Sequence, residues 1–410
     1  MNSYLAFIFR EKRVLSFGVS LTFFSSFGQT FLFALFVPYF LLEFDLSKSE
    51  FGTIYSIATL GSAFLLPAIG DKIDQIPIKY YSTAVAGMLA IASVFLAVSW
   101  NVASLFVAVL LLRLGGQGLS GHTADTTMAK VFEGDRGKAL SVSSLGYPIG
   151  EGLLPLAIAT LSTILYWRNL WWLTALIFLI LGAPWLYQLI RKHPVNERIA
   201  QPERATNGKK TFSFNPFEHF GMLRDPRMKY ILPAALMPPF WVTGFFLYQV
   251  SFGNELGWTT TMIASGFIGF AVARIVASLV VGPLIDRFTA RVLFPFYQVP
   301  LLLALTMPLI FPSGISVYLY LGCIGVGLGI GSPIKTALWT EMYGAEKIGA
   351  VRSLFAALMV FGTSLSPFVM GFILDSRAEL PQVFGIAITS VVLSMLLALV
   401  IYRRPAGKLI

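Results

Sequence analysis

The sequence has little charge and almost no cysteine. Of its 410 residues, 12% are charged and 56% are hydrophobic, and cysteine occurs once, at Cys323 inside an apolar run. Soluble proteins average roughly 45 to 50% apolar and 25% charged residues, so a water-soluble core is excluded. One cysteine also excludes a disulfide framework and a cysteine-rich metal site.

Recognisable motifs for metal, phosphate or nucleic-acid binding are also missing. The three histidines are too scattered for a zinc motif, and no glycine-rich stretch ends in Gly-Lys-Ser or Gly-Lys-Thr, as phosphate-binding loops do. The net charge of +10 is concentrated in connecting segments, which is typical of membrane topology rather than of nucleic-acid binding. We therefore expect no cofactor, no metal and no enzyme activity.

What the sequence does have is long apolar runs. A helix that crosses a bilayer needs about 20 apolar residues, and twelve such spans can be drawn. They lie near 14–41, 51–70, 79–99, 102–130, 139–163, 169–190, 229–253, 261–285, 291–312, 316–343, 349–374 and 382–402. The first run is too long for a cleavable signal peptide. The sequence predicts an all-α polytopic membrane protein.

Positive charge is strongly biased to one side of these spans. If the N-terminus is cytoplasmic, 24 of the 30 Lys and Arg residues fall on the cytoplasmic side, three fall outside, and three lie within spans. This bias predicts that both termini are cytoplasmic. We expect an integral protein of a bacterial inner membrane that functions as a monomer.

The chain divides into two halves that resemble each other. A polar, basic segment, 191–228, separates a six-span bundle in 1–190 from a second in 229–410. Six positions repeat with an offset of 212 residues, which indicates a parallel duplication. The pairs are Gly70 with Gly282, Asp74 with Asp286, Gly115 with Gly327, Gly137 with Gly349, Gly150 with Gly362 and Pro155 with Pro367.

Two of these pairs lie in short loops with a recognisable pattern. The loop after span 8 contains Gly282, Asp286, Arg287 and Arg291, and it resembles the G-x-x-x-D-R-x-G-R-R signature of the major facilitator superfamily, with Thr289 where that family usually has Gly. The resemblance implies twelve helices in two bundles and transport by alternating access. It also implies that the loop residues form a conformational latch between neighbouring helices.

The matching loop after span 2 is less complete. It keeps Gly70 and Asp74 but has Gln75 in place of the arginine. The resemblance therefore implies an intact latch in the second half and a weakened one in the first.

Further likenesses to that family concern the substrate. The stretch from Arg113 to Gly121 resembles the arginine- and glycine-rich fourth helix of organic-anion porters, including monocarboxylate transporters. Arg274 stands where several of these porters place a substrate-binding arginine, and Lys335 is a candidate for a similar role. Because spans 1, 4, 7 and 10 line the cavity in that family, the resemblance adds further candidate walls. These are Gln29, Gln117, Trp241 and Tyr248.

The charged residues inside spans are the strongest functional signal that does not depend on a resemblance. A charge at the centre of a spanning helix costs roughly 2.5 to 3.5 kcal/mol and usually marks a substrate or proton path. Arg113 on span 4 and Glu151 on span 5 are expected near mid-bilayer, with Tyr147 on the face of Glu151 and Gln117 on that of Arg113. A static buried ion pair is the alternative for the two charged residues.

The remaining charged residues are less informative. Asp125, three residues after His122 near the cytoplasmic end of span 4, is a candidate for proton coupling, although snorkelling to the interface explains it as well. No acid lies at the depth of Arg274 or Lys335 in the second half, which suits an anionic ligand or a carboxylate from the other half. Contact with helix C-terminal carbonyls and trapped water is the alternative.

The sequence thus predicts a secondary transporter for a small organic solute. The favoured solute is an organic anion such as a carboxylate, carried with protons by symport or antiport. Efflux of drugs or metabolites by proton antiport is the alternative.

Overall fold

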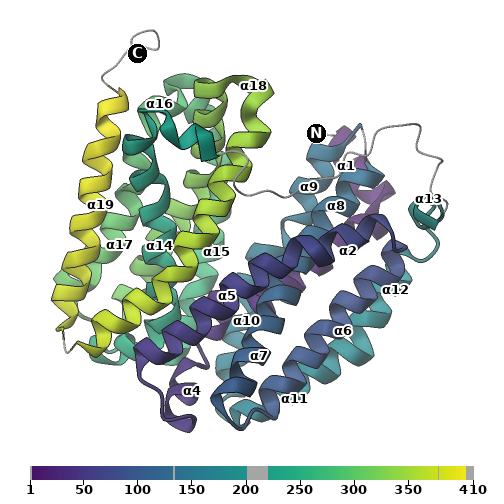
Figure 1. Cartoon of the computed structure of the whole chain (residues 1–410), viewed down its shortest axis with the longest axis horizontal. Coiled ribbons are helices and arrows are strands. Elements are labelled where there is room, and N and C mark those ends of the chain that lie inside the picture. Colours follow the sequence, from purple (N-terminus) through teal and green to yellow (C-terminus); the bar gives the residue numbers. More distant parts are fainter. Residues whose placement is uncertain (1, 133, 201–219, 377, 403–410) are drawn as a thin grey trace. The chain divides into compact units, whose positions relative to one another are not determined.

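The computed structural model describes residues 2–132, 134–200, 220–376 and 378–402. Within them the regular structure is helical (Figure 1). The described chain forms two compact units. The first contains the described parts of Met1–Tyr39 and Ile57–Ser213, and the second contains Phe40–Ser56 and the described part of Phe214–Ile410. The segment 40–56 thus packs with residues that are far from it in sequence.

The helices follow the apolar runs. Up to residue 200 they are α1 (Asn2–Arg10), α2 (Lys12–Phe24), η1 (Ser25–Gly28), α3 (Thr30–Phe33), α4 (Val37–Glu43), α5 (Lys48–Gly70), η2 (Asp71–Asp74), α6 (Ile78–Ala97), α7 (Val102–Leu112), η3 (Arg113–Ser120), α8 (Gly121–Val131), α9 (Arg136–Ser143), α10 (Gly146–Leu161), α11 (Trp167–Ile177), η4 (Phe178–Gly182), α12 (Ala183–Ile190) and α13 (Val195–Ala200). From residue 220 they are η5 (Phe220–Arg224), α14 (Met228–Gly253), η6 (Asn254–Leu256), α15 (Thr260–Phe288), α16 (Ala290–Leu293), η7 (Phe296–Gln298), α17 (Val299–Ile310), α18 (Ser316–Asp375) and α19 (Leu380–Tyr402).

Nine predicted spans are continuous helices. In the described residues, nine helical stretches are long and apolar enough to cross a membrane: Lys48–Asp74, Ile78–Ala97, Val102–Val131, Trp167–Ile190, Met228–Leu256, Thr260–Phe288, Ser316–Gly344, Val351–Asp375 and Leu380–Val400. The other three predicted spans contain shorter helices with interruptions. Near 14–41 the helix breaks at Gln29, near 139–163 it breaks between α9 and α10, and near 291–312 it consists of α16, η7 and α17.

Local chemistry explains where several helices begin or break. The α7 helix begins with a capping box, in which the Asn101 side chain accepts from the Ser104 amide at 2.8 Å and the Ser104 hydroxyl accepts from the Asn101 amide at 3.1 Å. Helix α18 contains two spans, and the chain bends at Gly344, where φ is +76°. Glycine allows this conformation because it has no Cβ.

Glycines also allow a close helix crossing in the second unit. A Cβ on Gly325 would lie 2.4 Å from the Phe270 carbonyl oxygen, and one on Gly329 would lie 2.5 Å from that of Arg274. The glycines of span 10 therefore serve close packing of α18 on α15, as small-residue stripes do in membranes.

Candidate functional site

The first span is broken beside an unusual turn of the fourth. Residues Ser25–Gly28 form a 3₁₀ turn, Gln29 is extended at φ −89° and ψ 150°, and the helix resumes at Thr30. Opposite this break, η3 is a π-helix, in which the Ser120 hydroxyl donates to the Gly115 carbonyl at 2.7 Å. Irregular turns within spanning helices often mark functional sites.

Glycines bring the two irregular segments together. A Cβ on Gly28 would lie 2.3 Å from the Leu112 carbonyl oxygen, and one on Gly116 would lie 2.5 Å from the Gly28 nitrogen. Only hydrogen fits at either position. The crossing holds the broken span against the start of the π-helix, where Arg113 is located.

Arg113 is buried at this crossing, with 3% of its surface exposed. Its Nη1 donates to the Gly28 carbonyl at 2.8 Å, and its Nε donates to the Thr59 hydroxyl of α5 at 3.1 Å. The break in the first span leaves backbone groups without helical partners, and Arg113 binds one of them. The guanidinium thus joins segments from spans 1, 2 and 4.

The fifth span packs on the same break. A Cβ on Gly150 would lie 2.1 Å from the Ser26 hydroxyl, so α10 lies against η1. Glu151 is the next residue and is half-buried. Arg113 and Glu151 therefore lie on two different helices that both contact the break. Their expected roles with substrate and protons stay predictions.

Three more predicted residues belong to this region. The Gln29 amide donates to the Ser25 hydroxyl at 3.1 Å, and the Tyr147 hydroxyl lies 2.6 Å from where a Cβ on Gly121 would be. Gln117 is exposed, whereas Ser120 and Thr127, which a regular helix would place on the same face, are buried. The π-helix explains the difference, because each of its residues rotates the chain by less than the 100° of an α-helix. Residues along and after it therefore no longer share the face that α-helical spacing predicts.

In the second unit, two predicted aromatic residues bond to their own chain. Tyr248 is fully buried, and its hydroxyl donates to the carbonyls of Lys48 at 2.6 Å and Pro367 at 3.2 Å. The Trp241 indole donates to the Ser390 hydroxyl at 2.6 Å. Beside Tyr248, the Asp375 carboxylate accepts the Lys48 amide at 3.2 Å and that of Ser49 at 2.7 Å. These bonds fix the start of α5 on α14 and α18.

The two cations of the second unit lie on helices that pack together. Arg274 of α15 is half-buried next to the Gly329 crossing. Lys335 of α18 is also half-buried, and its ammonium lies 5.8 Å from the centre of the Tyr297 ring. The Tyr297 hydroxyl itself donates to the Ala234 carbonyl. Among the described side chains Lys335 forms no ion pair.

Residues near the end of span 4 contact the first loop. Asp125 is exposed, and the His122 ring nitrogen lies 3.3 Å from the Gly70 carbonyl oxygen. The structure gives Asp74 a partner that the motif does not contain, because the Lys130 ammonium forms an ion pair with its carboxylate. The same ammonium lies 3.4 Å from the Ile73 carbonyl. Loop and span 4 are therefore tied despite Gln75.

The second loop is held in a different way. Asp286 is exposed and forms no ion pair with a described side chain, and Arg287 lies over the Phe288 ring at 5.1 Å. Instead, the Glu341 carboxylate accepts the backbone amides of Ala290 at 2.7 Å and Arg291 at 3.2 Å. A carboxylate at the start of a helix is favourable electrostatically.

Thr289 ends α15 in a strained conformation, with φ +66° and ψ 153°. This region is nearly exclusive to glycine, which accounts physically for the glycine of the family signature.

The first glycines of the two loops, Gly70 and Gly282, differ in their surroundings. Nothing lies within 4 Å of a Cβ on Gly282, whereas a Cβ on Gly70 would meet His122 at 3.3 Å.

Several of these partners could not be predicted from the sequence. Lys130 and Glu341 are visible in the sequence as charged residues near the ends of spans 4 and 10, but nothing in the sequence pairs them with a loop. A further cluster precedes span 7, where Asp225 accepts three side-chain bonds of 2.7, 2.9 and 3.0 Å from Arg227 and one of 2.9 Å from the Tyr343 hydroxyl. Burial opposes ionisation of Asp225, but the bonds from Arg227 and Tyr343 outweigh it and lower its pKa.

Comparison with known proteins agrees with this architecture. The family model of the Major Facilitator Superfamily matches residues 19–253 and 237–409. The chain therefore belongs to the major facilitator superfamily and is a multi-pass membrane transporter. No curated protein sequence matches it.

Solved structures share the fold at low identity. The nucleoside transporter NupG has a TM-score of 0.73 at 15% identity, covering 99% of this chain and 100% of that one. A NupG mutant gives the same TM-score at 12% identity, with coverage of 96% and 100%. A bacterial homolog of the human lysosomal transporter Spinster has a TM-score of 0.65 at 16% identity, with coverage of 95% and 94%. Identities this low support the fold alone.

Proposed function

We propose that this transporter moves a small organic anion, such as a carboxylate, and couples its movement to protons. The observation that carries the proposal is the placement of Arg113, a buried cation at the junction of a broken first span and a π-helix in the fourth. An apolar pair would hold these helices without desolvating a charge. We therefore assign the guanidinium a role in binding the solute.

Cations in the second half support an anionic substrate. Arg274 is the sole charged residue between Thr260 and Ile285, and Lys335 is the sole one between Ser316 and Thr340. Each would cost roughly 2.5 to 3.5 kcal/mol at the centre of a bilayer. A carboxylate solute would offset that cost when bound, and Glu151 would carry the coupled proton.

Two other substrate classes lead to different expectations. A drug or metabolite exporter would bind its substrate mainly through aromatic residues, but Trp241 and Tyr248 donate to groups of their own chain. NupG is a nucleoside transporter, and a nucleoside would be bound by amides such as Gln29 and Gln117 rather than by cations. The organic anion is favoured because Arg113, the most deeply buried of these charged residues, is a cation, and Arg274 and Lys335 add two more cations within spans.

Transport in vesicles tests the proposal. Purified protein in liposomes would be given small carboxylates, nucleosides and apolar drugs while a pH-sensitive dye reports proton movement. We expect a carboxylate to drive proton flux, and Arg113→Leu and Glu151→Gln each to abolish it while the protein still folds. Lys229→Gln, at an exposed lysine before span 7, is the matched control.

Three outcomes would contradict the proposal. Full carboxylate-driven flux in Arg113→Leu would remove the guanidinium from binding, and full flux in Glu151→Gln would remove that carboxyl from coupling. Transport of apolar drugs that survives Arg274→Leu, with no carboxylate flux in the wild type, would establish the efflux alternative.

A further inference from the structure

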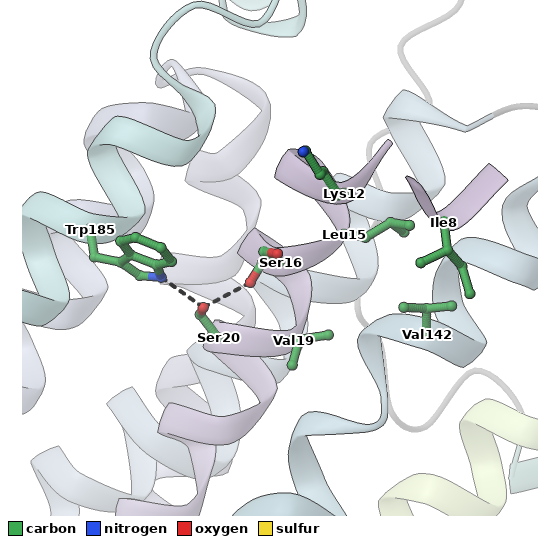
Figure 2. A pocket seen from close by; sticks show the side chains of 8 residues that line it. All are labelled: Ile8, Lys12, Leu15, Ser16, Val19, Ser20, Val142 and Trp185. Atoms are coloured by element: carbon green, nitrogen blue, oxygen red, sulfur yellow. Dashed lines mark hydrogen bonds between the residues drawn. The ribbon is translucent and has the colours of Figure 1, made fainter. Parts of the chain in front are cut away.

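A groove lies within the first unit, between α1, α2, α9 and α12 (Figure 2). Its volume is about 320 Å³. The residues that line it are mostly apolar, and we call it the Lys12 groove after its one charged member. They are Ile8, Lys12, Leu15, Ser16, Val19, Ser20, Val142 and Trp185.

The walls of the Lys12 groove are fixed by bonds between helices. The Arg13 guanidinium donates to the Gln188 carbonyl, which ties α2 to α12. On the other side, Phe7 packs edge-on against Phe132 with ring centres 5.3 Å apart, which holds α1 in place beside Ile8. The groove is therefore preformed, as binding sites for small ligands usually are.

Two polar side chains inside the groove, Trp185 and Ser20, already have partners. The Trp185 indole donates to the Ser20 hydroxyl at 3.0 Å, and that hydroxyl donates to the Ser16 carbonyl at 2.7 Å (Figure 2). What remains for an occupant is apolar surface together with the exposed Ser16 hydroxyl, because the indole N–H and the Ser20 proton are both used. A polar solute would gain little here.

Lys12 is the charged residue of the groove. Its neighbours in sequence are occupied, since Arg10 pairs with Glu11 at 2.9 Å and Arg13 binds Gln188. The Lys12 side chain is exposed, and its ammonium forms no hydrogen bond or ion pair with a described residue. The groove thus combines an apolar trough with one available cation at its edge.

The position along the chain places this cation at a membrane surface. Lys12 is the first residue of α2, and Trp185 lies six residues before Arg191, where the apolar run of the sixth span ends. Tryptophan gathers at the interface between lipid and water, and basic residues flank the cytoplasmic ends of spans. With the topology predicted from charge bias, the Lys12 groove faces the cytoplasmic leaflet.

We propose that the Lys12 groove binds one anionic phospholipid of that leaflet. Part of an acyl chain would lie on Ile8, Leu15, Val19 and Val142, and the headgroup phosphate would sit against the Lys12 ammonium. The volume lies at the lower end of the roughly 300 to 1,000 Å³ of small-molecule pockets, which suits a chain segment better than a whole solute. The charge of Lys12 selects an anionic over a zwitterionic headgroup. This proposal does not depend on the identity of the transported solute.

Quenching of tryptophan fluorescence tests it. The full-length protein would be placed in nanodiscs of phosphatidylcholine containing small amounts of brominated phosphatidylglycerol or brominated phosphatidylcholine with the same acyl chains. The signal of Trp185 is the difference between the wild type and Trp185→Phe. We expect phosphatidylglycerol to quench it at lower mole fraction. Because a basic residue near the surface contributes about 1 kcal/mol, Lys12→Gln should weaken that preference about five-fold.

Two further variants make the test specific. Val19→Phe, at a half-buried lining residue, should fill the trough and reduce quenching by both lipids, while leaving the charge of Lys12 in place. Lys229→Gln removes an exposed lysine at the start of α14 and should change nothing. Fluorescence of the remaining tryptophans checks that each variant is folded.

Several results would overturn the proposal. Equal quenching by the two lipids, or an unchanged preference in Lys12→Gln, would show that the headgroup is not recognised. Unchanged quenching in Val19→Phe would show that the chain does not occupy the groove. A second copy of the protein in the groove would appear as a dimer in nanodiscs that Val19→Phe dissociates, and this too would exclude the lipid.

Discussion

The two loops that carry the family signature are held by opposite arrangements of charge. After span 2 the acid is on the loop, and Asp74 pairs with Lys130 of span 4. After span 8 the acid is on the spanning helix, and Glu341 accepts two backbone amides of the loop. The loop that matches the signature better is the one whose own Asp286 forms no ion pair with a described side chain. A sequence signature therefore indicates which segments meet, but not which atoms hold them.

The backbone differs between the loops as well. Thr289 has φ +66°, whereas Pro77, which is 212 positions earlier, has φ −50°. The proline gives the first loop an unstrained backbone, whereas the backbone of the second loop is strained at Thr289. We propose that both loops nevertheless act as latches during alternating access, each through its own contacts.

The largest expected effect is the loss of the Glu341 carboxylate. Glu341→Ala leaves the amides of Ala290 and Arg291 without their acceptor, and hydrogen bonds to charged groups contribute about 1.5 to 3 kcal/mol. We expect the free energy of unfolding in mixed micelles to fall by about 2 kcal/mol. Glu255→Ala, at an exposed glutamate, is the control. A loss no larger than the control's would mean that Glu341 does not hold the loop.

Relief of strain should come next. A residue other than glycine in the conformation of Thr289 costs about 1 to 3 kcal/mol of strain. Glycine removes the strain but loses more chain entropy on folding, which offsets up to about 1 kcal/mol of the gain. Thr289→Gly should therefore stabilise the protein by about 1 kcal/mol, measured by the same unfolding assay. Pro77→Gly in the first loop should destabilise it. Stabilisation by both variants would contradict the difference between the loops.

The offset of 212 residues that relates the two loops also relates Asp225 of the second half to Arg13 of the first, an acid to a cation. The lowered pKa of Asp225 means that its charge stabilises the folded state above the ordinary carboxyl pKa of about 3.9. This stabilisation is lost as the pH falls through the lower, folded-state pKa. The difference in melting temperature between the wild type and Asp225→Asn should therefore be constant from pH 5 to 8 and shrink below about pH 4.

Arg13→Gln is the matched control for this titration. Arginine stays protonated at every accessible pH, so the effect of its loss should not depend on pH over the same range. A pH-dependent Arg13→Gln, or an Asp225→Asn difference that grows in acid, would disprove the assignment.

The smallest effects should come from the two loop aspartates. The Asp74 side chain is 68% exposed, and exposed ion pairs contribute about 0.2 to 1 kcal/mol. Asp74→Asn should cost no more than this, and Asp286→Asn should cost less. Transport tests the ion pair directly, because activity lost in Asp74→Lys should return when Lys130→Asp is added and the pair re-forms with its charges exchanged. No recovery in the double variant would contradict a local pair.

Much of the fold could be predicted because a bilayer imposes length and polarity on each helix. Nine spans coincide with uninterrupted apolar runs, and the glycines of span 10 pack where small residues were expected. The break at Gln29 and the π-helix were not predictable, because both depend on the Gly28 crossing between distant segments. Arg113 was found as a buried charge, but its bonds to Gly28 and Thr59 require the folded chain.

The partner of Tyr248 shows the same limit. Its hydroxyl binds the carbonyl of Lys48, 200 residues away. No pattern within span 7 contains that information, so helical periodicity alone could only place Tyr248 on a candidate wall. Side chains whose partners are local in sequence, such as Asn101 and Ser104, can be predicted, whereas those that join distant spans cannot.

The π-helix from Arg113 to Ser120 has more residues per turn than the α-helices on either side of it, so the fourth span contains an extra residue there. Deleting Gly118 would therefore restore an ordinary α-helix while keeping Asp125 and Lys130 in their present orientation, and a variant of this kind should still fold. Inserting a residue in α8 would instead rotate Lys130 by about 100° away from Asp74. The π-helix thus contains one residue that the fourth span can lose without changing the orientation of the helix that follows.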